Sequence, residues 1–201
     1  IVFVTSQPDI KPFMTKYRCI KKIISVRGGV DVLPARQYFE QEEFIPVENR
    51  YYDACFVGRF HYQKGILELI RIWKVVCNKK PKCRLALIGT GPLEGEIQSL
   101  INKMGLNSNI ILLGFLNGIK KFDVFKQSKI ILHPAIYDSG GMATAEAMAW
   151  GLPGVSFDLE ALKSYYPKGI LKTECFDLNA FANNILYLLS DPNAHLHLSQ
   201  E

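Results

Sequence analysis

The sequence predicts an α/β domain built on a Rossmann-like, doubly wound parallel sheet. Apolar runs of strand length alternate along the chain with segments whose apolar residues recur at helical spacing. The strand-length runs are apolar throughout, which is typical of strands that are covered on both faces. Glycine turns follow several of these runs, so we expect them to share the carboxyl edge of the sheet, where ligands of such folds bind.

Each predicted element rests on its own pattern. Residues 65–76 and 93–104 carry apolar side chains at helical spacing, and Pro92 suits the first turn of the second helix. Gly105 and Gly151 are expected to end helices. In chain order, we expect strands at 54–57, 85–88, 109–113, 130–133, 154–157 and 170–171, and helices at 65–76, 93–104, 119–127, 142–150 and 181–189.

Residues 1–50 differ from the rest of the chain. Short apolar runs at 1–5 and 23–26 could form strands, whereas the polar stretch 36–49 predicts a linker or surface loop. The chain begins with Ile1 and carries no recognisable signal peptide. We therefore expect a remnant of a preceding N-terminal domain and an interdomain linker over 1–50, followed by a complete domain over 51–201.

Composition narrows the class of protein. The chain has 201 residues, a net charge of +5 and no apolar run near the ~20 residues of a membrane span. Its basic residues are not interleaved with aromatic ones and no groove-reading motif occurs, so no nucleic-acid partner is expected. The five cysteines lack C-x-x-C spacing, which argues against a disulfide scaffold or zinc site and for a reducing compartment. We expect Cys55 and Cys175 in the core, and His195 and His197 on the surface.

The most informative segment runs from 133 to 153. A predicted strand leads to Gly140 and Gly141, which open a predicted helix. The first amides of a helix are unpaired and carry partial positive charge, and glycine lets a phosphate or sugar approach them. Asp138 and Glu146 flank this turn with seven residues between them. A carboxylate one turn into the helix suits hydroxyl groups, so the segment predicts a ligand with both phosphates and sugars.

The same residues also have structural interpretations. Asp138 could cap the helix or form an Asx turn, and Glu146 could be an exposed helix glutamate. His133, which precedes Pro134, is expected to be a buried and hydrogen-bonded structural residue.

Two further loops could contribute to a site. Arg59 and Lys64 flank the loop after strand 54–57, and Lys64 is expected to begin a helix, where a cation opposes the dipole and needs an anion beside it. A diphosphate would supply that anion, although two solvated basic residues fit the spacing equally well. The run Gly89-Thr90-Gly91 resembles part of a dinucleotide fingerprint, but a tight strand-to-helix turn explains it at least as well.

Five motifs in register resemble one enzyme family. They are Gly58-Arg59 with Lys64-Gly65, Leu87-Ile88-Gly89-Thr90-Gly91-Pro92, Leu113-Gly114-Phe115-Leu116, Asp138-x7-Glu146 with Ala147-Met148-Ala149, and Gly151-Leu152-Pro153. Their order and spacing resemble the C-terminal, nucleotide-sugar-binding half of the GT-B glycosyltransferases of family four (glycosyl transferases group 1). The match covers about residues 50–192, and Gly28-Gly29-Val30-Asp31 resembles the interdomain junction motif of that family.

The resemblance implies a role for each matched position. Arg59 and Lys64 would bind the donor diphosphate, and Asp138 would contact the donor sugar. These three would be the catalytic residues. Glu146 would hold the ribose hydroxyls. Backbone positions would complete the donor site: Gly89 and Gly91 in the nucleotide cleft, Phe115 and Leu116 at the base, and Gly140, Gly141, Met142 and Ala143 near the sugar and phosphate.

Two departures from the family pattern fall at the sugar subsite. The family usually has a glutamate where this chain has Asp138, and Gly-Phe-Gly or similar where it has Ser139-Gly140-Gly141. Both changes bear on the identity of the donor sugar and on activity.

By resemblance, the chain is part of a retaining, metal-independent glycosyltransferase (EC 2.4 class) that uses a nucleoside diphosphate sugar as donor. No Asp-x-Asp metal motif occurs and no cofactor is expected. The missing N-terminal domain would supply the acceptor site for a glycan or lipid-linked sugar, so the fragment alone should be inactive. The alternatives are a non-catalytic nucleotide-sugar-binding module or a GT-B relative such as a nucleotide-sugar epimerase.

The family context implies polysaccharide or glycoconjugate biosynthesis in the cytoplasm. The mild basicity of the chain permits peripheral association with the cytoplasmic membrane.

Overall fold

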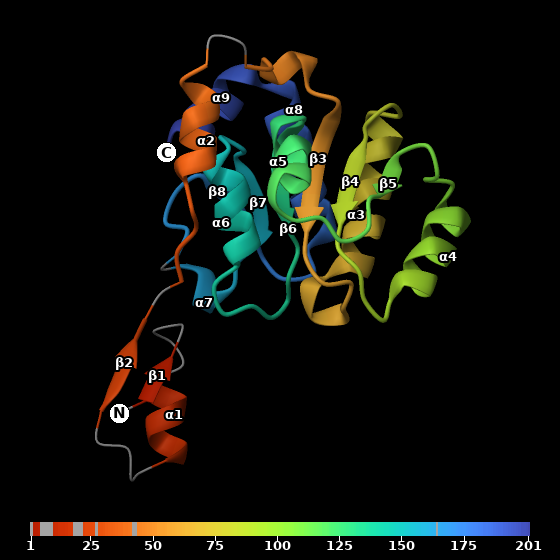
Figure 1. Cartoon of the computed structure of the whole chain (residues 1–201). Helices are drawn as coiled ribbons and strands as arrows, with labels where there is room; N and C mark the ends of the chain where they lie inside the picture. Colours follow the sequence, from red (N-terminus) through yellow and green to blue (C-terminus); the bar gives the residue numbers. More distant parts are fainter. Residues whose placement is uncertain (1, 5–9, 18–21, 27, 42–43, 164) are drawn as a thin grey trace.

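The computed structural model describes residues 2–4, 10–17, 22–26, 28–41, 44–163 and 165–201 (Figure 1). Cys19 and the ends of the strand predicted at 1–5 lie outside this part of the chain. The main unit is a six-stranded parallel sheet with the strand order β5-β4-β3-β6-β7-β8, as the doubly wound prediction required. Its strands are β3 (Tyr52–Val57), β4 (Leu85–Ile88), β5 (Ile110–Leu112), β6 (Ser128–His133), β7 (Gly154–Phe157) and β8 (Ile170–Thr173).

The sheet winds outward in two directions from its centre. The chain runs from β3 through β4 to β5 on one side, and from β6 through β7 to β8 on the other. β3 and β6 lie side by side, with Ala54 opposite Ile130 and Cys55 opposite Ile131. The direction of winding therefore reverses between β3 and β6, and a crevice opens at their carboxyl ends.

Helices cover both faces of the sheet (Figure 1). One face is covered by α3 (Ile66–Lys79), α4 (Glu94–Met104) and α8 (Leu178–Ser190). The other is covered by α2 (Leu33–Phe39), α5 (Gly118–Lys126) and α6 (Met142–Ala149). The remaining elements of the main unit are η2 (Val47–Asn49), η3 (Tyr62–Lys64), α7 (Glu160–Lys163) and α9 (Pro192–Gln200).

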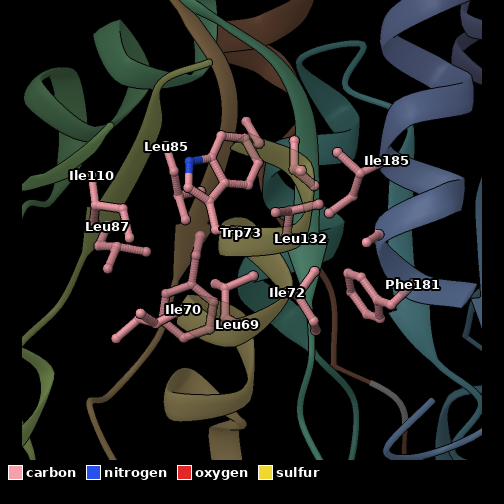
Figure 2. Close-up of a cluster of buried hydrophobic side chains, with 14 of the residues drawn as sticks. Leu69, Ile70, Ile72, Trp73, Leu85, Leu87, Ile110, Leu132, Phe181 and Ile185 are labelled. Atoms are coloured by element: carbon pink, nitrogen blue, oxygen red, sulfur yellow. The ribbon is translucent and has the colours of Figure 1, made fainter. Parts of the chain in front are cut away.

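The larger core lies between the sheet and helices α3 and α8. Figure 2 shows Trp73 of α3 packed among side chains from the strands, with Leu132 of β6 and Phe181 of α8 nearby. All three side chains are buried. Burial of this apolar surface at roughly 25 cal/mol per Å² is the main force that holds the site-bearing loops at the sheet edge.

The smaller core lies on the other face, beneath α2, α5 and α6. Cys55 of β3 and Ala147 of α6 are fully buried there, and the Tyr38 and Trp150 rings lie 5.6 Å apart between centroids. The loop predicted over 36–49 is therefore wrong at its two ends, because residues 36–39 belong to α2, which packs onto this core, and residues 47–49 form η2. The described residues between them, 40–41 and 44–46, form no helix or strand, as predicted. Only Ala35 and Tyr38 of α2 are buried, so the helix leaves a weak apolar pattern in the sequence. The domain boundary at residue 50 remains a prediction.

The strands β1 (Val2–Val4) and β2 (Ile23–Ser25) form a separate two-stranded parallel sheet, joined through α1 (Ile10–Lys16). Both strands were predicted, whereas α1 was not. Figure 1 shows this small unit below the main one, connected by the segment that carries the Gly28-Gly29-Val30-Asp31 motif.

Two other surface and core predictions need correction. His195 is buried in α9, where its Nε2 lies 2.9 Å from the Lys129 carbonyl oxygen, although we expected it on the surface. Cys55 is buried as expected, whereas Cys175 is only half-buried, although it packs against the larger core. In the described residues, no helix combines the length and apolar character needed to cross a membrane.

Candidate functional site

Two cavities open at the carboxyl edge of the main sheet. The first, which we call the β3–β6 cavity, has a volume of about 310 Å³ at the point where the winding reverses. Its lining includes Lys64, His133, Asp138 and the turn 139–143. Gly28 of the junction motif also lines it, and a Cβ atom at Gly28 would lie 2.7 Å from the Met142 sulfur.

The second, the β4–β5 cavity, has a volume of about 490 Å³ and lies beside the first. Val57 and Gly58 line both cavities, so they form one continuous crevice along the sheet edge. The β4–β5 cavity is also lined by Arg59, Gly89, Gly91, Phe115, Leu116 and Lys121.

Lys64 and Asp138 form an ion pair in the β3–β6 cavity. Lys64 Nζ lies 2.6 Å from Asp138 Oδ2, and the Asp138 side chain is only 10% exposed. Lys64 is the last residue of η3 and does not begin a helix as predicted, since α3 starts at Ile66. The anion that we expected beside Lys64 is thus supplied by the protein itself.

The glycine turn before α6 is held from two sides. Asp138 Oδ1 accepts hydrogen bonds from the amides of Gly140 (3.1 Å) and Gly141 (2.9 Å), which is the predicted Asx-type turn. The Tyr166 hydroxyl donates to the carbonyl groups of the same two glycines. No described residue accepts a hydrogen bond from the amides of Met142 and Ala143. These two amides therefore remain available to a ligand at the N-terminal end of α6.

Electrostatics keep Asp138 ionised. Burial opposes its ionised form, but the hydrogen bond from Lys64, the adjacent His133 and the two glycine amides outweigh burial and lower the pKa of Asp138 to about 2. The Asp138 carboxylate is consequently a permanent negative charge at neutral pH. With Lys64 beside it, the pair presents little net charge to a ligand.

His133 is the buried, hydrogen-bonded residue that we predicted. Its Nδ1 lies 2.9 Å from Thr144 Oγ1, and burial followed by the charge of Lys64 lowers the pKa of His133 to about 4 against the opposing effect of Asp138. The ring is therefore neutral at pH 7, so its 3.5 Å approach to Asp138 Oδ2 is no ion pair. Within the described residues, His133 Nε2 has no hydrogen-bond partner.

Arg59 and Glu146 occupy contrasting environments. Arg59 is exposed at the β4–β5 cavity, and among the described residues it has no acidic partner. Glu146, on α6, forms an ion pair with Lys121 of α5 at 2.6 Å between Oε2 and Nζ. Acidic side chains balance the charges of Lys64 and Lys121. Among the described residues, no acidic side chain balances the charge of Arg59, so this charge is available to a ligand.

The Gly89-x-Gly91 turn packs closely against the backbone of Gly58 and Phe60. A Cβ atom at Gly89 would lie 1.9 Å from the Gly58 carbonyl oxygen, and one at Gly91 would lie 2.4 Å from that of Phe60. The Gly91 amide donates to Glu94 Oε1 at 2.8 Å, so it is not available to a ligand. These contacts bear out the structural interpretation of the motif, and both glycines also line the β4–β5 cavity.

The structure brings most of the predicted site residues to one crevice. Lys64, Asp138 and the 140–143 turn meet in the β3–β6 cavity, and Arg59, Gly89, Gly91, Phe115 and Leu116 in its neighbour. Glu146 lines neither cavity and reaches the β4–β5 cavity through its partner Lys121. In the part of the chain described, no three His, Cys, Asp or Glu residues could hold a metal ion.

Three residues of this site were not predicted from the sequence. Tyr166 supports the glycine turn, Thr144 holds His133, and Lys121 pairs with Glu146. Thr144 could have been noticed, because it stands one helical turn after Gly140 in the segment already singled out. Tyr166 and Lys121 gave no signal, since each lies about 25 residues from its partner.

Comparisons with known proteins agree with this architecture. Residues 38–201 match the sequence model of the family described as "Glycosyl transferases group 1". An uncharacterized glycosyltransferase of Methanocaldococcus jannaschii is 30% identical over 165 residues, which cover 79% of this chain and 39% of that protein. The phosphatidylinositol N-acetylglucosaminyltransferase gpi3 subunit of Schizosaccharomyces pombe is 24% identical over 67% of this chain and 30% of its own length. The chain thus spans about two fifths of these relatives or less.

Solved structures share the fold. The structure of S. aureus TarM with UDP and alpha-GlcNAc-glycerol superposes with a TM-score of 0.84 and 19% identity, over 99% of this chain and 38% of TarM. The C-terminal domain of a group 1 glycosyl transferase from Francisella tularensis gives a TM-score of 0.66 with 20% identity, over 86% of this chain and 93% of that domain. The chain has the Rossmann-like architecture of one half of the GT-B fold, and it belongs to the glycosyl transferases group 1 family.

Proposed function

We propose that this chain binds a nucleoside diphosphate sugar and acts as the donor-binding half of a glycosyltransferase. The observation that carries the proposal is the continuous crevice at the β3–β6 switch point. It combines the cation Arg59 with the α6 amides of Met142 and Ala143, and none of these three groups has a partner among the described residues. A diphosphate has the charge and the acceptor oxygens for both groups.

The two cavities suit the two ends of such a donor. Phe115 is 71% exposed at the rim of the β4–β5 cavity, where its ring is available to stack on a base. The β3–β6 cavity carries Asp138 and Lys64 and is the smaller of the two, which suits a sugar. A diphosphate that joins base and sugar would then cross the shared residues Val57 and Gly58, with Arg59 next in the chain.

Transfer of the sugar follows from this placement. The bond between the anomeric carbon and the diphosphate oxygen breaks, and its electron pair stays on the diphosphate. Arg59 and the α6 amides stabilise the added negative charge without a metal ion. A new bond forms between the anomeric carbon and an acceptor oxygen, whose proton passes to the departing diphosphate. We propose that the stereochemistry is retained, as the family resemblance implies.

The acceptor side lies outside this chain in our proposal. We expect an N-terminal domain to bring an acceptor glycan or lipid-linked sugar over the crevice, and Gly28 of the junction motif already lines the β3–β6 cavity. TarM was solved with UDP and alpha-GlcNAc-glycerol, which supports a pair of donor and acceptor of this kind. We place the protein in the cytoplasm, free of a cofactor and peripheral to the membrane when its acceptor is lipid-linked.

A specific observation favours a second candidate, a non-catalytic donor-binding module. Asp138 is one methylene shorter than the usual glutamate of the family, and its carboxylate is occupied by Lys64 and two glycine amides. Asp138→Glu in the full-length protein separates the candidates. Increased turnover supports a weakened enzyme, whereas no transfer with any donor before or after the substitution supports the module.

A thermal-shift panel with UDP, GDP and ADP tests the shared part of the proposal. A bound nucleotide stabilises the folded state by mass action, so at least one of the three should raise the melting temperature. Arg59→Ala should remove that shift, while Arg36→Ala, which removes an exposed arginine paired with Glu40, should leave it intact. A panel without any shift for the intact chain would overturn donor binding.

A further inference from the structure

We propose that Lys121 is a positioning residue of the donor site. It holds the Glu146 carboxylate ready for the neutral hydroxyl groups of a ribose, and it cancels the carboxylate's charge in a crevice that must accept an anion. This inference rests on the proposed function, and it assigns Lys121 a part in selecting ribonucleotides over deoxyribonucleotides.

The geometry links the two side chains across two helices. Lys121 lies on α5 and lines the β4–β5 cavity, whereas Glu146 lies on α6, one turn beyond the unpaired amides of Met142 and Ala143. Their side chains are 16% and 22% exposed, and 2.6 Å separate Nζ from Oε2. An ammonium group buried to this extent is costly unless an acid accompanies it, so Lys121, which lines the cavity, holds Glu146 directly behind the cavity wall.

The pair resolves an electrostatic conflict. A lone carboxylate beside a diphosphate repels it, and the low dielectric of a partly closed crevice strengthens that repulsion. Because Lys121 forms an ion pair with Glu146, the two side chains together have no net charge. Among the described cations that line the crevice, Arg59 then remains without an acidic partner, and the crevice keeps a net attraction for the diphosphate.

The pair also leaves a defined acceptor. Lys121 approaches Oε2, and no other described residue contacts the Glu146 carboxylate through a hydrogen bond or an ion pair. The second oxygen, Oε1, is therefore available to accept from hydroxyl groups. A fixed acceptor of this kind favours a vicinal diol over a single hydroxyl, because both hydroxyls can donate to one held carboxylate.

The chain offers a matched control next to this residue. Lys120 precedes Lys121 on the same helix, is exposed and has no acidic partner among the described residues. Lys120→Met removes the same charge from the same helix without touching the pair. Lys121→Arg retains a cation that can still reach the carboxylate.

The experiment measures binding by calorimetry with the best binder among UDP, GDP and ADP, and with its 2′-deoxy counterpart. For Lys121→Met we expect ribonucleotide affinity to fall about tenfold and deoxyribonucleotide affinity to fall less, so that the ratio between them drops toward one. Lys121→Arg should restore most of the ratio, and Lys120→Met should leave it unchanged. Circular dichroism melts confirm that each variant is folded.

A double-mutant cycle with Glu146→Gln separates positioning from a general structural role. If Lys121 acts through Glu146, the double variant Lys121→Met/Glu146→Gln binds ribonucleotide no more weakly than Glu146→Gln alone. Additive losses, or an unchanged ribose-to-deoxyribose ratio in Lys121→Met, would overturn the inference while nucleotide binding itself stands. Tighter ribonucleotide binding by Lys121→Met would also overturn it, since Lys121 would then compete with the ribose.

Discussion

Lys64 lies 2.6 Å from Asp138, and this ion pair joins the loop after β3 to the loop after β6 across the switch point of the sheet. The two residues are separated by 74 positions in the sequence. Lys64, which we expected to hold a ligand phosphate, is therefore engaged in an ion pair that links the two sides of the crevice. Because Lys64 Nζ and the glycine amides all surround one carboxylate, Asp138 organises the site before any ligand arrives.

The first prediction concerns the strength of this ion pair. In a double-mutant cycle with Lys64→Met and Asp138→Asn, we expect a coupling free energy of about 1–3 kcal/mol, because the pair is mostly buried. The same cycle on Arg36 and Glu40, whose side chains are 76% and 62% exposed, should give less than about 0.5 kcal/mol. Urea denaturation of the wild type and the six variants provides the values. Equal coupling in both pairs would show that Lys64 and Asp138 do not brace the crevice.

The second prediction concerns Gly65, which follows Lys64 in a left-handed conformation (φ +62°). A Cβ atom at Gly65 would lie 1.8 Å from the Pro134 carbonyl oxygen, so Gly65→Ala must push the β3 and β6 loops apart. We expect a loss of at least about 3 kcal/mol in the free energy of unfolding, or failure to fold.

Gly105 is the matched control for this substitution. It has nearly the same conformation (φ +66°), but a Cβ atom there would meet nothing within 4 Å. Gly105→Ala should therefore cost only the backbone strain, about 1 kcal/mol. Similar losses for the two variants would mean that the contact between Gly65 and Pro134 does not constrain the site.

The difference between Gly65 and Gly105 also separates what the sequence predicts, a turn at each glycine, from what it does not, the neighbour that each glycine meets. Glycine after an apolar run marks the turn, and continuous apolar runs mark strands that are buried on both faces, so the sheet and its edge were predictable. The close approach to Pro134 was not, because it depends on which strand becomes the neighbour of β3. Sequence patterns report local conformation and burial, whereas partners across the sheet follow from topology.

Polar partners escaped prediction for the same reason. The sequence marked Glu146 and Asp138 as candidates by their spacing around the glycine turn, but it gave no means to identify Lys121 or Lys64 as their partners. α2 and α9 were missed because few of their residues face the core: Ala35 and Tyr38 in one, His195 in the other. A helix with so narrow a buried face has the composition of a surface loop.

The third prediction concerns the base-binding end of the crevice. Phe115 is largely exposed and lines the β4–β5 cavity, so Phe115→Ala should weaken nucleotide binding about 5- to 50-fold through lost stacking while the melting temperature of the free protein stays unchanged. Ile119 provides the control, because it is 75% exposed nearby on α5 without lining that cavity. Calorimetric titration with the preferred nucleotide measures both variants. An equal effect of Ile119→Ala would indicate nonspecific loss of apolar surface.

The fourth prediction concerns stability against pH. Burial lowers the pKa of His133 in the folded protein to about 4 from its usual 6.5. Folding therefore favours the neutral ring: this contribution is complete above about pH 6.5 and is lost as the pH falls toward 4. Asp138 acts in a separate window, because its folded pKa of about 2 lies below the usual 3.8, and its contribution is lost only below about pH 4.

Melting temperatures measured from pH 7 to pH 4 should therefore fall for the intact protein, and His133→Gln should flatten that fall. Glutamine can still donate to Thr144 but does not titrate, so the remaining slope should come largely from His195, whose pKa burial also lowers. His197→Gln is the control, since His197 is exposed on the same terminal helix as His195. If His133→Gln and His197→Gln change the slope equally, the buried ring beside Asp138 is not what makes the folded crevice sensitive to acid.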